Sequence, residues 1–380
     1  MDTRFVNCTR CELCATAAAI YNSPFVQFSL LFRLLFAPLA AMGIGLLMVA
    51  IYKAKALHCN ARRLLVFMTL STLFCNMGVL AETLYKFFIS YVMPEDTRCD
   101  YQVFKPQYLS AIRNFYSVGG MGLVLSTGTL AIERTVATVF YRTYEKRDEY
   151  PILGFMLLFI EFLFCVLPVL MITTPKQVYP YNPPELTDSR STLFASGAIL
   201  IVNFLSLLVF LTLWIINRYR ARILVDEQFR VLSTRYQLRE NISTTRLMVP
   251  VMAIVALVTT SAEIIYMMYM PVYDGNTVVT HRVLQELMDY APFAEYQMSL
   301  MPVLTIAMVV CLPMFSTHLK RAFLTVSHLS LCIPDNYTVA DTVTVDQARE
   351  IYFERLNGQW KEKPRNEVAP KNVGYSMSVF

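Results

Sequence analysis

The chain has 380 residues, of which 56% are hydrophobic and only 16% are charged, and its net charge is +5. Soluble domains hold roughly 45–50% apolar and 25% charged residues, so a soluble core cannot absorb this excess of apolar side chains. The composition therefore indicates a membrane protein. Its small basic surplus favours contact with anionic lipid or an acidic protein partner, and no nucleic acid is expected to bind.

Seven apolar segments follow one another along the chain, each long enough as a helix to cross about 30 Å of hydrocarbon. They run from Phe28 to Tyr52, Leu64 to Phe88, Asn114 to Thr138, Ile152 to Ile172, Leu193 to Ile216, Leu247 to Met270 and Pro292 to Phe315. The expected fold class is an all-α membrane protein, a bundle of seven transmembrane helices. The expected domains are a segment at 1–27, a transmembrane domain at 28–316 and a tail at 317–380, which begins with a short amphipathic helix and then becomes disordered.

The orientation in the membrane follows from lysine and arginine beside short loops, which remain on the cytoplasmic side. Most of these residues lie after the first, third and fifth spans: Lys53, Lys55, Arg62, Arg63, Arg134, Arg142, Lys146, Arg147, Arg218, Arg220, Arg222, Arg230, Arg235, Arg239 and Arg246. The connections after the second, fourth and sixth spans carry only Arg98, Lys105, Lys176, Arg190 and Arg282. The segment 1–27 is therefore expected to be extracellular and the tail cytoplasmic, which is the architecture of G-protein-coupled receptors. Asn7 lies in a glycosylation acceptor triplet of the outside segment, in agreement with this orientation.

Cysteines on the outside are the ones that can form stable disulfides. The loop between the fourth and fifth spans contains no cysteine, so Cys99 is expected to pair with Cys8, Cys11 or Cys14. The spacing of the latter three also fits a metal site, but the sequence offers no obvious fourth ligand and the oxidising side favours disulfides. On the cytoplasmic side, Cys332 follows an amphipathic stretch and is either a palmitoylation site or a plain thiol.

Polar residues at membrane depth mark functional-site hypotheses. Asn76, Glu161 and Asn203 lie near the middle of their spans, where they either line a shared cavity or form hydrogen bonds that fix helix packing. Glu82 and Lys86 are four residues apart in the second span and are expected to form an ion pair.

The ligand pocket is expected between the third, fifth, sixth and seventh spans. Glu263 lies in the outer third of the sixth span, and Arg113 and Glu295 lie at the outer mouth of the bundle. Glu263 and Arg113 are predicted to be the charged ligand contacts, with Asn203 and Glu161 as further candidates, because small-molecule pockets need a few orienting polar groups in apolar surroundings.

The predicted spans lack residues that several classes of membrane protein need for their function. All four histidines lie outside the predicted spans and no aspartate lies within one, which excludes intramembrane proteases with a Ser–His pair or two membrane aspartates. The last span has no lysine for a retinal Schiff base. An odd number of spans without repeated halves disfavours a transporter. Neither catalytic activity nor a cofactor is expected.

The third span ends with Glu133 and Arg134, an acid and an arginine at the cytoplasmic boundary. Glu133 can hold the guanidinium while the helices are closed, and a conformational change can release it to bind carbonyls of a docked partner. The alternative is that Arg134 only anchors the helix at the lipid headgroups. The loop 217–246 has no glycine or proline, so the fifth and sixth helices are expected to continue beyond the membrane as basic arms.

Two cytoplasmic sequence patterns occur together, Glu133-Arg134-x-x-Ala137-Thr138 with the later Tyr144-Glu145, and Leu232-Ser-Thr-Arg235-Tyr236-Gln237-Leu-Arg-Glu240-Asn241. In combination they resemble the nematode serpentine chemoreceptors of the Sra superfamily, most closely class epsilon (Sre), with Srab or Srb next. The resemblance covers the whole membrane region. The coupling face that it implies consists of Tyr144, Glu145, Arg235, Tyr236, Gln237, Glu240 and Asn241.

The resemblance implies a chemosensory receptor in the plasma membrane, in sensory cilia, that binds a small molecule from outside and signals through a heterotrimeric G protein. Thr135 after the arginine and Cys311-Leu-Pro313 in the last span depart from rhodopsin-like receptors, so the activation switches are expected to differ in detail. A ligand-gated channel or transporter is the alternative function, and a non-signalling membrane scaffold is the third.

Overall fold

The computed structural model describes residues 9–54, 57–104, 106–140, 152–171, 181, 189–226, 232–269 and 280–328. Within the helices, the side chains at 106, 107, 110, 167–171, 189–195, 221–226 and 232–240 are not described. The candidate site residues Asn7, Cys8, Tyr144, Glu145 and Cys332 lie outside the described part.

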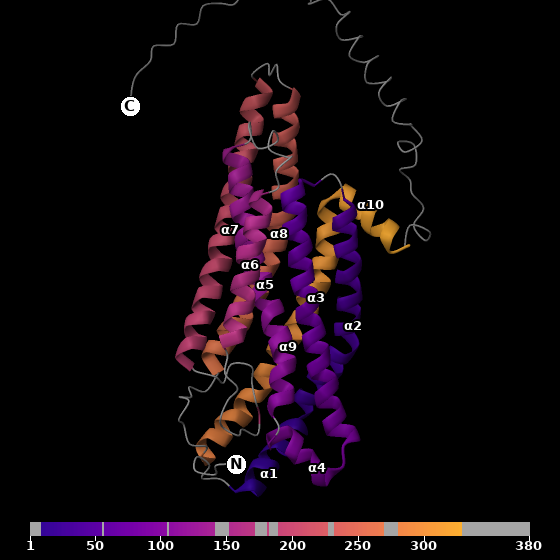
Figure 1. The fold of residues 1–380 in the computed structure, drawn as a ribbon, viewed down its shortest axis with the longest axis vertical. Coiled ribbons are helices and arrows are strands. Elements are labelled where there is room, and N and C mark those ends of the chain that lie inside the picture. The colour runs from indigo at the N-terminus through magenta and orange to yellow at the C-terminus, as the bar shows by residue number, and fades with distance from the viewer. Residues whose placement is uncertain are drawn as a thin grey trace, which may run out of the picture. The chain divides into compact units, whose positions relative to one another are not determined.

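All regular elements of the described part are helices (Figure 1). They are α1 (Arg10–Tyr21), α2 (Pro24–Lys53), α3 (Cys59–Phe87), the π-helix η1 (Phe88–Val92), α4 (Glu95–Cys99), the π-helix η2 (Asp100–Phe104), α5 (Pro106–Val139), α6 (Ile152–Met171), α7 (Ser189–Asp226), α8 (Leu232–Tyr269), α9 (His281–Phe315) and α10 (Thr317–Val326). Each of the seven long helices, α2, α3 and α5 to α9, overlaps one of the seven predicted spans. Six of them are long and apolar enough to cross a membrane, and α6 has a shorter apolar stretch, Ile152–Val166.

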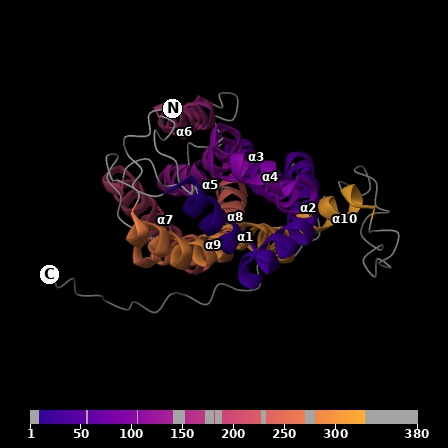
Figure 2. The same ribbon diagram turned by 90° about the horizontal axis from the view of Figure 1, so that it is seen from below.

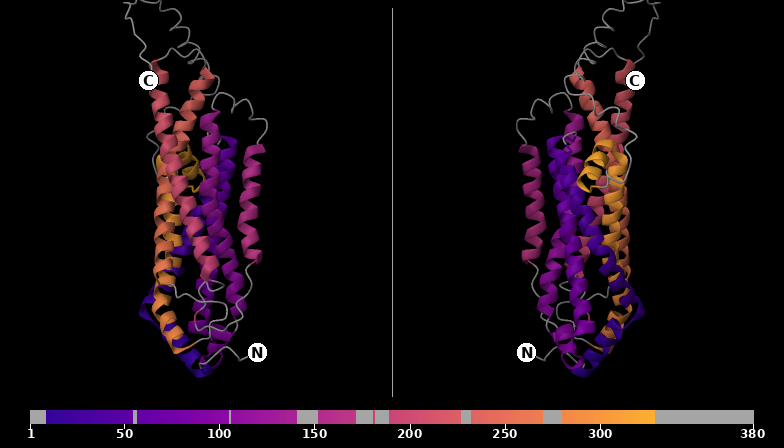
Figure 3. Two further views of the ribbon diagram at one scale, coloured as in Figure 1. Left: turned by 90° about the vertical axis from the view of Figure 1, so that its left-hand side faces the viewer. Right: turned by 90° about the vertical axis from the view of Figure 1, so that its right-hand side faces the viewer.

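The long helices form a closed ring of neighbours, in which α2 contacts α3 and α9, α9 contacts α8, α8 contacts α7, and α7 contacts α5, which returns to α3. Seen from the end that carries α1, α8 lies between α5 and α9 (Figure 2). Helix α5 packs against α3, α6, α7 and α8, whereas α6 touches only the α3 and α5 side and stands at the edge of the bundle (Figure 3). The third span thus contacts four other long helices, so side chains at both of its ends can reach several of them.

Glycines let α3 and α5 approach each other closely. A Cβ atom on Gly119 of α5 would lie 2.7 Å from the carbonyl oxygen of Ser71 on α3, and one on Gly78 of α3 would lie 2.7 Å from the backbone nitrogen of Tyr116 on α5. Small residues at such contacts are typical of membrane helices, which associate through close packing because lipid gives little hydrophobic drive between helices. The α3–α5 pair therefore forms the tightest seam of the bundle among the glycine contacts of the described residues.

The outward faces of the long helices are apolar. Large hydrophobic side chains such as Phe28, Leu35, Phe159, Phe204 and Leu257 are more than half exposed. An apolar surface of this extent would cause a soluble protein to aggregate, but it suits contact with lipid chains. The hydrophobic core lies between the helices instead, around Leu47, Met68, Leu130, Val255 and Leu304.

The observed helices extend beyond most predicted spans. Helix α2 starts at Pro24, so the expected domain boundary at 27/28 falls inside this helix, and α9 starts at His281, eleven residues before the predicted Pro292. Proline is well suited to the first turn of a helix, where its missing N–H costs nothing. The predicted arms are confirmed, because α7 continues to Asp226 and α8 begins at Leu232. The predicted amphipathic helix after the last span is also present as α10.

Candidate functional site

A group of charged side chains is buried between the helices toward the end of the bundle that carries α1. We call it the charged cluster, and its members are Arg33 on α2, Glu82 and Lys86 on α3, Arg113 on α5 and Glu295 on α9. Each is at least nine-tenths buried, and Arg33 and Glu295 are 0% exposed. Ionic groups at membrane depth are expensive unless they are paired, so their contacts decide whether this arrangement is stable.

Glu295 is the hub of the charged cluster. Its carboxylate forms an ion pair with Arg33, lies 2.6 Å from the Lys86 Nζ and accepts a hydrogen bond of 2.9 Å from the Tyr181 hydroxyl. The Lys86 Nζ also lies 5.4 Å from the centre of the Tyr181 ring. Burial raises the pKa of Tyr181 well above its ordinary value, so this hydroxyl remains protonated and donates. Glu295 therefore joins α2, α3 and α9 to Tyr181.

Lys86 connects the two carboxylates of the cluster. Its Nζ lies 2.5 Å from Glu82 Oε1 along α3, so the ion pair predicted from the four-residue spacing is confirmed. Three buried atoms of the cluster have no hydrogen-bond partner among the described residues: Arg33 Nη1, Glu82 Oε2 and Arg113 Nε. Arg113 interacts electrostatically with Glu82.

Arg33 is the member of the cluster that the sequence reasoning missed. It lies within the first predicted span, where an arginine in an otherwise apolar segment is itself a signal of a functional or paired site. Glu295 was placed at the mouth of the bundle, whereas the structure buries it completely because α9 starts well before Pro292.

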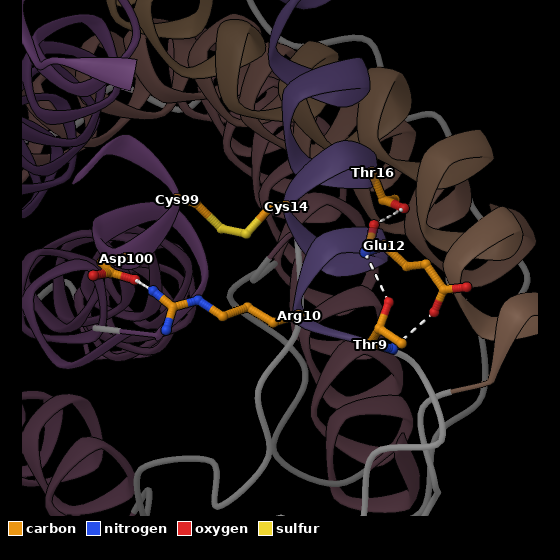
Figure 4. Close-up of a disulfide and its surroundings, with 7 residues drawn as sticks. All are labelled: Thr9, Arg10, Glu12, Cys14, Thr16, Cys99 and Asp100. Carbon is orange, nitrogen blue, oxygen red and sulfur yellow. Dashed lines mark hydrogen bonds and ion pairs between the residues drawn. A yellow bond between two sulfur atoms is a disulfide. The ribbon is translucent and has the colours of Figure 1, made fainter. Parts of the chain in front are cut away.

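Helix α1 is fastened beside the cluster by a disulfide between Cys14 and Cys99 (Figure 4). Of the three partners left open for Cys99, the structure therefore selects Cys14, which is then not available as a metal ligand, while Cys11 is a free, exposed thiol. An ion pair between Arg10 and Asp100 lies next to the disulfide.

The start of α1 is stabilised by a capping box. The Thr9 hydroxyl accepts from the backbone N–H of Glu12 at 3.3 Å, and the Glu12 carboxylate accepts from the backbone N–H of Thr9 at 2.7 Å. These hydrogen bonds to Thr9 lower the pKa of Glu12 below its ordinary value. Farther along α1, Leu13 and Ala17 pack with Leu287 of α9, so the helix is held by apolar contacts as well as by the disulfide.

The three polar residues predicted at mid-depth do not form one network. Asn76 donates to Thr305 on α9, and Asn203 donates to Thr259 on α8 at 2.9 Å. Glu161 accepts hydrogen bonds from Ser126 and Thr129, two hydroxyls of α5. Each residue thus joins its helix to a different neighbour, which agrees with the packing interpretation, and no described contact links the three residues to one another.

The four predicted ligand contacts likewise fall in three places. Arg113 belongs to the charged cluster, Glu161 lies at the α5–α6 contact, and Asn203 lies between α7 and α8. Glu263 on α8 is half-buried and hydrogen-bonds Ser196 on α7. The contacts of the described residues do not bring these four side chains together in a single site.

The opposite end of α5 carries the Arg134 site, formed by Glu133, Arg134 and Asn241. The carboxylate of Glu133 binds the guanidinium of Arg134, and the two residues are 0% and 1% exposed. Arg134 Nη1 lies 3.5 Å from the Asn241 Oδ1 on α8, and Asn241 Nδ2 donates to the carbonyl oxygen of Ala137 at 3.2 Å. Asn241 therefore contacts α5 twice.

Further polar contacts close this end around the Arg134 site. Arg220 on α7 donates to the carbonyl oxygen of Thr138 at 2.7 Å, and Asn217 lies between the hydroxyls of Thr138 and Thr245. Three helices, α5, α7 and α8, thus meet through hydrogen bonds rather than through apolar contacts alone. Of the predicted coupling face, Asn241 is the residue with a described side chain, while Arg235, Tyr236, Gln237 and Glu240 lie on α8 without one.

Residues 11–361 match the sequence family described as serpentine type 7TM GPCR receptor class ab chemoreceptor. This chain belongs to that family. Among individual proteins, serpentine receptor class alpha/beta-14 of Caenorhabditis elegans is 22% identical over 300 residues, which are 76% of this chain and 74% of that relative. A multi-pass membrane protein of the seven-helix chemoreceptor type is thereby established, in agreement with the helices described above.

The comparison confirms the resemblance to nematode serpentine receptors and corrects the class within it. Class ab, which the sequence reasoning placed second, is the class that matches, and the preference for class epsilon has no specific support. The two sequence patterns around Arg134 and Asn241 are short, so they indicated the superfamily but did not separate its classes.

Proposed function

We propose that this serpentine receptor binds a small molecule from outside the cell and signals through a heterotrimeric G protein, at the plasma membrane of a sensory cilium. The observation that carries the signalling part is the arrangement of Arg134. The guanidinium is buried near the end of α5, Glu133 holds it, and Asn241 contacts it from α8.

This arrangement suits a switch with two states. In the closed state the acid neutralises the guanidinium, and Asn241 holds α8 against α5. When α8 moves away, Arg134 loses that contact, and its planar set of donors becomes available to backbone carbonyls of a docked protein. The ends of α7 and α8 beyond the predicted spans are rich in arginine and lie on the same side, which suits an acidic partner.

The ligand-binding part of the proposal concerns the end that carries α1, which faces outside if the charge distribution of the loops sets the orientation. Arg113 and Glu263 are proposed as charged contacts at two separate places of this end. Arg113 is supported by its buried Nε without a hydrogen-bond partner, and Glu263 by its half-buried position between α7 and α8. A ligand that contacts α5 or α8 at this end would act on the same two helices that meet at Arg134, and so would affect the contact between them.

The decisive experiment measures nucleotide exchange on G proteins by the full-length receptor at matched surface expression. Glu133→Gln removes the charge that restrains Arg134, and if that restraint is about 1–2 kcal/mol, basal exchange rises about five- to thirtyfold while the active fraction is small. Adding Arg134→Ala to this variant abolishes the exchange, whereas Arg134→Lys restores little, because an ammonium lacks the planar geometry of a guanidinium.

Arg218→Ala is the matched control, because Arg218 is exposed and its guanidinium lies 5.6 Å from the Trp214 ring, as suits an anchor near headgroups. It should leave exchange unchanged. Undiminished exchange with Arg134→Ala would reduce Arg134 to such an anchor and contradict the switch, and ion flux without any exchange would favour a channel.

A further inference from the structure

We propose that the charged cluster binds the carboxylate group of a small acidic ligand, and that Arg113 is the residue that receives it. The inference deepens the ligand-binding part of the proposed function and rests on it. It follows from the charge balance of the cluster, from the pairing of its members and from the burial of Arg113.

The cluster contains more positive than negative charge. Arg33, Lys86 and Arg113 face only Glu82 and Glu295, which leaves a surplus of one positive charge among the described residues. This surplus does not depend on how the five groups are paired. An unbalanced charge in a region of low dielectric constant is costly, so an anion that enters the cluster provides a counter-charge that the described residues do not supply.

The pairing identifies the group that carries the surplus. Arg33 is committed to Glu295, and Lys86 lies within 2.6 Å of an oxygen of each carboxylate. Arg113 makes no ion pair within the described part of the chain, and its Nε has no hydrogen-bond partner although the residue is only 9% exposed. Its guanidinium offers several donors in one plane, which is the geometry that binds a carboxylate through two parallel hydrogen bonds.

The surroundings favour an organic acid over an inorganic ion. Tyr181 and Tyr21 are both buried beside the cluster, where Tyr181 contacts Glu295 and Lys86, and Tyr21 interacts electrostatically with Lys86 and Arg113. Aromatic rings next to an anchoring cation provide apolar contact area for the rest of a ligand.

The test uses acetate, the simplest carboxylate, with purified full-length receptor in lipid nanodiscs at constant ionic strength. The melting temperature of the wild type is expected to rise about 3–6 °C between 0 and 100 mM acetate and to saturate, as ligand binding to the folded state requires. Arg113→Gln abolishes the rise. Arg282→Gln, which changes an exposed arginine of α9 whose partner is Glu286, keeps it.

Two further arms test the chemistry. Acetamide, neutral and of similar shape, should give no rise, and chloride should give a much smaller one. An equal rise with chloride or acetamide, a rise that persists in Arg113→Gln, or no rise with acetate would each overturn the assignment. If Arg113→Gln does not fold, Arg113→Lys keeps the charge but not the paired donors and should weaken acetate binding about tenfold.

The same preparations separate this inference from the proposed signalling function. Basal nucleotide exchange by the Glu133→Gln receptor needs no ligand. Exchange without an acetate effect would remove the carboxylate site and leave the receptor function intact. An acetate effect without nucleotide exchange would support the carboxylate site and contradict the proposed signalling function.

Discussion

Arg33 on α2 and Glu295 on α9 form an ion pair in which neither side chain is exposed. The pair joins the first and last long helices and so closes the ring of the bundle. Glu295 also binds Lys86 of α3, which makes this one carboxylate the counter-charge for two cations. A buried pair of this kind adds little stability compared with an apolar pair, but breaking it from one side leaves an uncompensated charge.

We therefore expect Glu295→Gln to be strongly destabilising, by about 3–5 kcal/mol, because Arg33 and Lys86 lose their shared carboxylate. The melting temperature of the purified receptor measures the effect. Glu286→Gln on the same helix is the control, since its ion pair with Arg282 is exposed and worth little. Equal stability of the two variants would contradict the role assigned to Glu295.

The close approach of α3 and α5 predicts that alanine has different effects on stability at the neighbouring residues Gly119 and Gly120. Gly119→Ala should destabilise the receptor by about 1–3 kcal/mol, because the added methyl group meets the backbone of α3. Gly120→Ala, where a Cβ atom meets nothing within 4 Å, should be neutral or slightly stabilising. Melting temperatures that fall equally for both would show that α3 and α5 do not approach as described.

Substitution of Asn241 should raise basal nucleotide exchange less than substitution of Glu133 does. Asn241→Ala removes the contact with Arg134 and the hydrogen bond to the Ala137 carbonyl, and a loss of about 1 kcal/mol in the closed state raises basal nucleotide exchange about fivefold. Asn203→Ala removes a comparable bond between α7 and α8 far from Arg134 and serves as the control. A basal rate that stays at the wild-type level would leave Asn241 without a part in the switch.

The stability losses from substituting the two cysteines of the disulfide should not add. Cys14→Ser and Cys99→Ser should each lower stability by about 2–4 kcal/mol, and the double substitution should cost no more than either one, because all three remove the same bond. Cys11→Ser is the matched control, since this thiol is free. Thermal unfolding under non-reducing conditions gives the comparison, and additive losses would mean that the two cysteines act separately.

The seven spans were predictable because an apolar run of sufficient length has few alternatives to a membrane helix. Their ends were not, because a helix continues into water wherever nothing interrupts it, as α9 does from His281. Helix α1 was missed although Thr9-x-x-Glu12 fits the capping box that the structure contains. This pattern alone marks Thr9 as the start of a helix.

The candidate site was predictable in part. Glu133 and Arg134 stood out because they are adjacent at the end of a span, and Glu82 and Lys86 because they are four residues apart. Partners from other helices, such as Arg33 for Glu295 or Asn241 for Arg134, depend on how the bundle packs, and a single sequence does not carry that information. For the same reason the three mid-depth residues were grouped by depth, although each bonds to a different neighbour.

The charged cluster also bears on how the chain is made. Arg33 and Lys86 are synthesised with the first two spans, but Glu295 is not synthesised until the last one. A product that stops before α9, from a premature stop codon or a truncated transcript, would hold three basic groups against Glu82 alone inside the bilayer. Such a product should fail during membrane integration and be degraded, so truncation late in the coding region would act as a complete loss of the receptor rather than yield a protein that binds but does not signal.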